Sequence, residues 1–232
     1  MVNNIYPQRS VAVIDALANK LLTNYLSHYQ MALTLPIPVE DIAEQFLGYD
    51  IDFSETGIFS NPEILGGIDF ERNKIYVNTS VANHDGRYSF TVAHELGHHI
   101  LHREYYLQYK DIEDSNMLCR MKGRKPQIEI EADRFAAALL IPYDNVFDAV
   151  AQQVQRVVTI GQAKALSRNL IENRGFSNVS NSAMINRLKD LNILPPSIPY
   201  QAANNKKNYA PPSTSKFLLK LFLKYQNIIL GK

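Results

Sequence analysis

The sequence of 232 residues lacks the features that would cross-link it or anchor it in a membrane. A single cysteine, Cys119, excludes a disulfide framework and any metal site built from several thiolates. No run of 18 or more apolar residues is present, so no transmembrane helix is expected. The first ten residues carry no basic stretch followed by an apolar one, so no signal peptide is expected either. These absences predict a soluble, cytoplasmic protein, long enough to bury a core of its own.

Acidic residues are missing after Asp190, although six lysines follow it. Those lysines are Lys206, Lys207, Lys216, Lys220, Lys224 and Lys232. The chain has 24 Lys and Arg, and subtracting these six leaves 18 basic residues in 1–190. The same region contains all 23 acidic residues, so its net charge is −5, while the segment after Asp190 has a net charge of +6. A mildly acidic body is not typical of a protein that binds nucleic acid, so we expect no direct nucleic-acid partner.

Hydrophobic spacing predicts a mostly helical α+β fold with a small mixed or antiparallel sheet and a C-terminal helical extension. The expected helices begin after the N-cap Ser10 and cover 39–46, 85–103, 129–140, 162–173 and 181–191. Alternation near 51–53 and 68–70, followed by 74–77, predicts the strands, and the polar stretch 110–127 predicts a loop or flap. The expected organisation is a domain with its N-terminal helix over 1–150, a helical segment over 151–195, and a linker and basic apolar tail over 196–232.

The pattern H-E-x-x-H occurs at residues 94–98 and predicts a metal site. Residues four apart lie on one face of a helix, so the imidazoles of His94 and His98 can bind one ion. Glu95 lies about 100° round the helix, beside the metal, where a water or substrate would bind. An apolar stripe next to the histidines predicts that this helix has a buried face; it comprises Phe90, Ala93, Gly97 and Leu101.

Zinc sites of this kind need a third protein ligand. A third histidine six residues after His98 is excluded, because that position is Glu104. By helical geometry His99 should face solvent, and His102, one turn beyond His98, would need an unusual reach. A carboxylate from a separate helix is therefore the expected ligand, which gives a His₂Glu site.

The segment 129–140 offers two such carboxylates, and the sequence favours Glu131 over Glu129. Glu131 shares a helical stripe with Phe135 and Leu139, which should pack inward, and a buried carboxylate requires a partner. Several alanines would let this helix approach the histidine helix closely. The alternative is that Glu131 only complements the helix dipole, a role that Glu129 could fill equally well.

These two blocks, Phe90–His98 with Leu101-His102 and Glu131–Pro142, resemble the ImmA/IrrE family of zinc metallopeptidases over roughly residues 35–195. The resemblance implies a zincin-like, gluzincin-like fold, Zn²⁺ bound by His94, His98 and Glu131, and Glu95 as the catalytic residue. Several members cleave a helix-turn-helix repressor encoded in mobile elements or stress loci, which implies a protein substrate of this kind. One departure is Asp133, where the family often has Asn.

The expected mechanism is hydrolysis of a peptide bond by zinc-bound water with Glu95 as general base. The strand Lys74–Asn78 is a candidate to hold the substrate as an added β-strand. The alternative function is a DNA-binding or partner-binding regulator with a structural or inactive metal site, since 162–173 and 181–191 could form a helix-turn-helix. The tail over 216–232 has apolar residues at helical spacing with lysines between them. This pattern predicts contact with a membrane surface or a partner. The alternatives are that the tail docks on the rest of the protein or is disordered.

Overall fold

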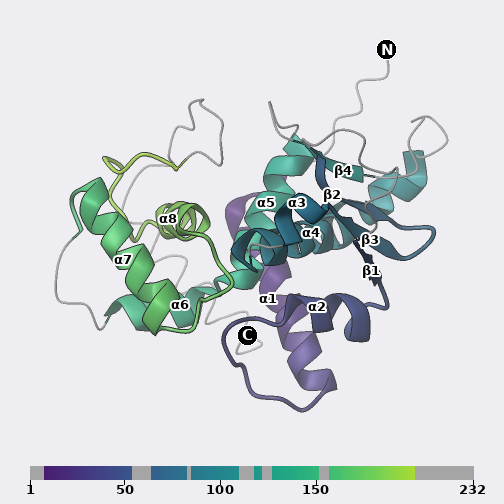
Figure 1. The fold of residues 1–232 in the computed structure, drawn as a ribbon, viewed down its shortest axis with the longest axis horizontal. Coiled ribbons are helices and arrows are strands. Elements are labelled where there is room, and N and C mark those ends of the chain that lie inside the picture. The colour runs from purple at the N-terminus through teal and green to yellow at the C-terminus, as the bar shows by residue number, and fades with distance from the viewer. Residues whose placement is uncertain are drawn as a thin grey trace, which may run out of the picture.

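The computed structural model describes six stretches of the chain, which Figure 1 shows as a coloured ribbon. They are residues 8–53, 64–82, 85–109, 118–121, 127–151 and 157–201. The basic tail over 216–232, for which the sequence predicts membrane or partner contact, lies outside the described residues. Within them, no helix is both long and apolar enough to cross a membrane.

Two packed helices form the centre of the molecule (Figure 1). The long helix α4 (Asp85–Tyr109) carries the H-E-x-x-H pattern, and α5 (Gln127–Leu140) packs along it. Helix α1 (Val11–His28) packs on another side of α5, so α5 is buried between two neighbours. The Ser10 side chain accepts a hydrogen bond from the Val13 N–H, which confirms the predicted N-cap.

A small mixed sheet lies beside α4, in the order β1-β3-β2-β4. Its strands are β1 (Asp50–Asp52), β2 (Ile64–Asp69), β3 (Lys74–Val77) and β4 (Leu118–Met121). β3 pairs with β1 in parallel, and the other pairs are antiparallel, which confirms the predicted mixed sheet.

Two expectations about this sheet are wrong. β3 has a neighbour on each side, so its backbone groups are already paired and it cannot accept a substrate as an added strand. The loop predicted over 110–127 contains β4, which pairs with β2. The remainder of 110–127, apart from the first residue of α5, lies outside the described residues.

The second half of the chain adds helices α6 (Tyr143–Ala151), α7 (Ile160–Asn173) and α8 (Asn181–Asp190). A reciprocal capping box between Thr159 and Gln162 begins α7. Gly175, with φ of +86°, follows the end of α7, where glycine readily adopts the left-handed conformation that stops a helix. Helix α6 is absent from the elements predicted from the sequence.

Short helical segments connect α1 to the sheet and the sheet to α4. They are α2 (Val39–Asp41), the π-helical η1 (Ile42–Phe46) and α3 (Thr79–Ala82). Gly48, with φ of +74°, follows η1 in the same left-handed conformation.

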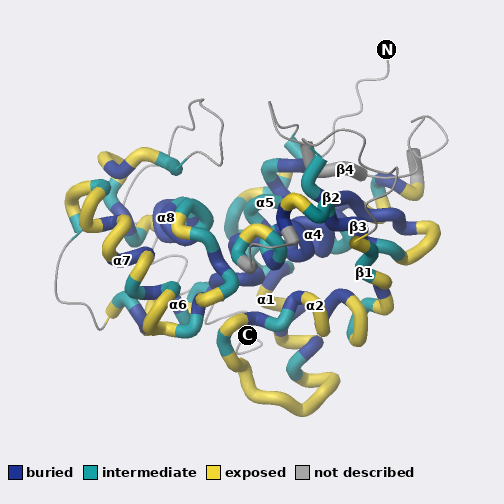
Figure 2. The backbone as a smooth tube through the Cα atoms, viewed as in Figure 1, coloured by how far each residue is buried: buried dark blue, intermediate teal, exposed yellow. Residues whose placement is uncertain are grey.

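The two basic side chains that a DNA-reading α8 would need are buried instead. The Arg187 guanidinium donates to Asp15 Oδ1 at 2.7 Å and to the Ile141 carbonyl at 3.1 Å. The Lys189 ammonium donates to the carbonyl of Ile198. Both cations therefore hold α8 to its own protein. Figure 2 shows α4 largely in the dark blue of buried residues, and His94, Glu95 and His98 on this helix have no exposed surface.

Candidate metal centre

The buried face of α4 carries both histidines of the H-E-x-x-H pattern. His94 and His98 have no exposed surface, and their Nε2 atoms lie 3.0 Å apart. Ala93, Gly97 and Leu101 of the predicted apolar stripe are buried, but every residue of 91–98 is buried as well, so this part of α4 is enclosed on all sides. One turn of helix therefore points two imidazole nitrogens at the same place, as the spacing predicts.

The approach of α5 to this face depends on Gly97. A Cβ atom at Gly97 would lie 3.1 Å from both the Cα and the carbonyl oxygen of Ala132, and 3.2 Å from the Cβ of Phe135. These distances are tighter than ordinary van der Waals contact, so only glycine lets the two backbones come so close. The predicted close approach of the alanine-rich helix is confirmed at Ala132.

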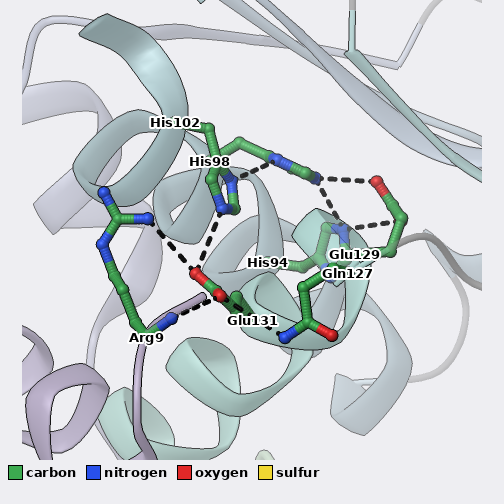
Figure 3. A network of polar contacts seen from close by, with 7 residues as sticks. All are labelled: Arg9, His94, His98, His102, Gln127, Glu129 and Glu131. Carbon is green, nitrogen blue, oxygen red and sulfur yellow. Dashed lines mark hydrogen bonds and ion pairs between the residues drawn. The ribbon is translucent and has the colours of Figure 1, made fainter. Parts of the chain in front are cut away.

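The carboxylate that α5 brings to the histidines belongs to Glu129 (Figure 3). Its Oε1 lies 3.1 Å from His98 Nε2, and its Oε2 lies 3.3 Å from His94 Nε2. One ligand atom from each of the three buried residues can be chosen so that all lie within 4.8 Å of one another. Two imidazole nitrogens and one carboxylate are the ligand set of a catalytic zinc site that leaves the fourth position open.

Glu131, which the sequence favours as the third ligand, faces a different neighbour. Its Oε1 accepts a hydrogen bond of 2.8 Å from the Arg9 backbone N–H, and its Oε2 lies 3.2 Å from the Arg9 guanidinium. Glu131 Oε2 also lies 3.7 Å from His102 Nε2, so both carboxylates reach α4, and Glu129 is the one of the two that contacts His94 and His98. Glu131 is fully buried, as predicted, but it is buried beside Arg9, just before α1, and a cation there already compensates its charge.

The electrostatics of the cluster favour an ionised carboxylate. Burial opposes the charge of Glu129, but hydrogen bonds with His94 and His98 outweigh it and lower the carboxyl pKa below its ordinary value. Burial disfavours a charged His94, yet its hydrogen bonds with Asp133 and Glu129 raise its pKa; for His98, burial dominates and lowers the pKa. In a metal site an ionised Glu129 and two neutral rings would be the ligands.

Two side chains that the sequence analysis did not place at the site fix the far nitrogen of each histidine ring. Asp133 Oδ1 lies 3.0 Å from His94 Nδ1, and His102 Nδ1 lies 2.9 Å from His98 Nδ1. Such partners orient a metal-binding imidazole through the nitrogen that does not bind the metal. Spacing in the sequence could have identified both residues. Asp133 lies four residues after Glu129, and His102 lies four residues after His98, so each shares a helix face with a residue of the site.

His99 is half-buried rather than solvent-facing, contrary to the prediction. Its Nδ1 lies 2.8 Å from the Tyr49 hydroxyl, and the two rings meet edge to face. Burial, and secondarily the charge of Arg103, lowers the pKa of His99 to about 4. His99 thus joins α4 to the segment before β1.

Glu95 lies where α4 and β2 meet. Its side chain is fully buried, and β2 passes close to it because residue 66 is glycine. A Cβ atom there would lie 2.5 Å from Thr91 Cγ2 and 3.1 Å from Glu95 Oε1. The strand therefore forms one wall around Glu95, beside the two histidines.

Comparison with known families agrees with this geometry. The model of the IrrE N-terminal-like domain, a family of M78 peptidases, matches residues 38–174, more than half of the chain. The matched segment includes α4 and α5 together with the strands between α2 and α5. No curated protein matches the chain.

Proposed function

Because the chain belongs to the IrrE N-terminal-like family of M78 metallopeptidases, we propose that it is a zinc-dependent endopeptidase that cleaves one specific protein. The observation that carries this proposal is the convergence of His94, His98 and Glu129 in a buried cluster beside Glu95. Neither composition nor fold alone would support it, since one fold can serve many functions.

We propose that Zn²⁺ is held by His94 Nε2, His98 Nε2 and the Glu129 carboxylate. A zinc ion bound there would supply Lewis-acid chemistry and a water of lowered pKa. Elemental analysis of purified protein tests the ligand set. Wild type should carry one zinc per chain, and Glu129→Gln should lose it. Zinc retained by Glu129→Gln but lost by Glu131→Gln would reverse the assignment.

The proposed role of Glu95 follows from its position next to His94 on α4. Its carboxylate accepts a proton from the attacking water and gives that proton to the amide nitrogen that leaves. The buried surroundings exclude bulk water from this transfer. Asp133 and His102 keep the two histidine rings oriented while Glu95 acts.

The substrate that we propose is a helix-turn-helix transcriptional repressor. The support for this finer statement is the resemblance of the two sequence blocks to a family in which several members cleave such repressors. The decisive experiment is co-expression with a repressor encoded beside the gene, for wild type and Glu95→Gln. Wild type should cleave the repressor. Glu95→Gln should bind zinc normally and leave the repressor intact, and full cleavage by this variant would contradict the mechanism.

A further inference from the structure

A line of polar side chains extends away from the proposed zinc ligands toward the start of α1 (Figure 3). His98 Nδ1 lies 2.9 Å from His102 Nδ1, and His102 Nε2 lies 3.7 Å from Glu131 Oε2. Glu131 in turn accepts the Arg9 backbone N–H at 2.8 Å and lies 3.2 Å from the Arg9 guanidinium. The three inner members, His98, His102 and Glu131, are almost completely buried.

If His98 is to bind a metal through Nε2, the N–H groups along this line can point in only one direction, from His98 toward Glu131. The Nε2 of His98 faces Glu129 and must keep its lone pair, so its Nδ1 carries the proton. That N–H then donates to His102 Nδ1, which leaves the N–H of His102 on Nε2. This group faces Glu131, whose ionised carboxylate can accept but cannot donate.

Glu131 can end the line as a carboxylate because it has cationic and amide donors on its other side. Arg9 supplies two N–H groups, and the Gln127 side-chain amide donates to Glu131 Oε1 at 3.4 Å. A fully buried carboxylate without such partners would be strongly destabilising, because its charge would be unpaired and out of contact with water. Arg9 therefore supplies the counter-charge that holds Glu131 in place facing His102.

We propose that His102 and Glu131, anchored by Arg9, are positioning residues that fix the tautomer and ring orientation of His98. This inference rests on the proposed zinc site at His94, His98 and Glu129. It gives Glu131 a role in metal binding that acts through His102 rather than by direct ligation. His94 has its own shorter arrangement, in which Asp133 faces its Nδ1.

Zinc affinity measured against a chromophoric chelator tests the proposal in the full-length protein. Glu131→Gln and His102→Leu should each bind one zinc at saturation, with affinity weakened roughly 10–100-fold. His102→Asn offers an amide oxygen near the position of Nδ1 and should recover much of the loss. Arg9→Gln should weaken zinc binding as well. Lys20→Gln, which removes an exposed cation from α1, is the matched control and should leave the affinity unchanged.

Nitrogen-15 NMR of zinc-loaded protein reports the tautomer directly. Wild type should show His98 protonated at Nδ1 and a downfield N–H resonance that His102→Leu shifts or removes. If Glu131→Gln no longer binds one zinc per chain at saturation, as is expected of Glu129→Gln, then Glu131 is a ligand and the inference fails. If the Glu131 and His102 variants lose only thermal stability and keep wild-type zinc affinity, the line of contacts merely docks α1, and the inference fails again. A wild-type chain that binds no zinc would instead refute the proposed function.

Discussion

Replacement of Gly97 by alanine tests how closely α4 and α5 approach. The added Cβ would lie 3.1 Å from the Ala132 backbone and 3.2 Å from the Cβ of Phe135, so α5 must move by a few tenths of an ångström. Alanine gains about 1 kcal/mol over glycine inside a helix. Overpacking of a close contact costs about 1–3 kcal/mol. The two effects leave a net loss of about 0–2 kcal/mol in the free energy of unfolding.

Thermal unfolding of the metal-free protein, followed by circular dichroism, measures this loss. For a chain of this length, 1 kcal/mol corresponds to roughly 2–4 °C, so Gly97→Ala should lower Tm by up to about 8 °C. Gly161→Ala is the matched control, because the nearest atom to its Cβ would be Thr159 Oγ1 at an ordinary 3.8 Å. This control should keep or slightly raise Tm, since α7 gains helix propensity without a clash.

The same substitution should also weaken zinc binding. Glu129 precedes Ala132 by three residues, so both lie on the side of α5 that faces α4. A displacement of α5 at Ala132 therefore moves the Glu129 carboxylate relative to His98. Zinc affinity should fall in Gly97→Ala and stay at the wild-type value in Gly161→Ala. If Gly97→Ala raised Tm as much as the control and kept full affinity, the close packing of the two helices would be refuted.

Three other outcomes follow from the site and the core. Chelation of zinc by EDTA should abolish cleavage and added zinc should restore it, whereas cleavage that survives complete zinc removal, checked by elemental analysis, would exclude a zinc mechanism. Zinc affinity, measured at a series of pH values, should fall as the pH is lowered. The pKa of His94 is raised, and below that pKa a proton competes with zinc for the ring. An affinity that is independent of pH would contradict this reasoning. Arg187→Met should destabilise the protein by about 3–5 kcal/mol in urea unfolding, because it leaves Asp15 without its cation, while the exposed Arg168→Met should change little.

Local signals in the sequence predicted several helix ends, because those ends depend on residues close in the chain, although α4 continues to Tyr109, past its predicted end at residue 103. The Ser10 side chain caps α1 through its own neighbour Val13, and Gly48 and Gly175 adopt positive φ where helices stop. Pro142 comes shortly after the last residue of α5, and by itself a proline after a helix indicates only where that helix ends. Its carbonyl also accepts from the Val146 N–H, so the same proline stands at the start of α6.

Features that depend on distant partners could not be predicted in this way. The strand β4 has no clear alternation, and its place is set by pairing with β2, which is about fifty residues earlier in the chain. The carboxylate nearest to the two histidines shows the same limit. Glu129 and Glu131 both reach α4, and spacing in the sequence does not show which of them lies at His94 and His98. Burial did not help, because α5 is enclosed by α4 on one side and α1 on another, and both carboxylates are buried.

The second buried carboxylate also connects the N-terminal region to the site. The family match begins at residue 38, after α1, yet Arg9, two residues before that helix, binds Glu131 on α5. Asp15, also in α1, binds Arg187 in α8, which lies beyond the end of the match at residue 174. Without Arg9, the charge of the fully buried Glu131, two residues from Glu129, would lack its cationic partner in a water-excluded region. The segment just before α1 therefore compensates a charge that α5 carries beside the proposed zinc ligands, and contacts that support this site involve residues on both sides of the matched segment.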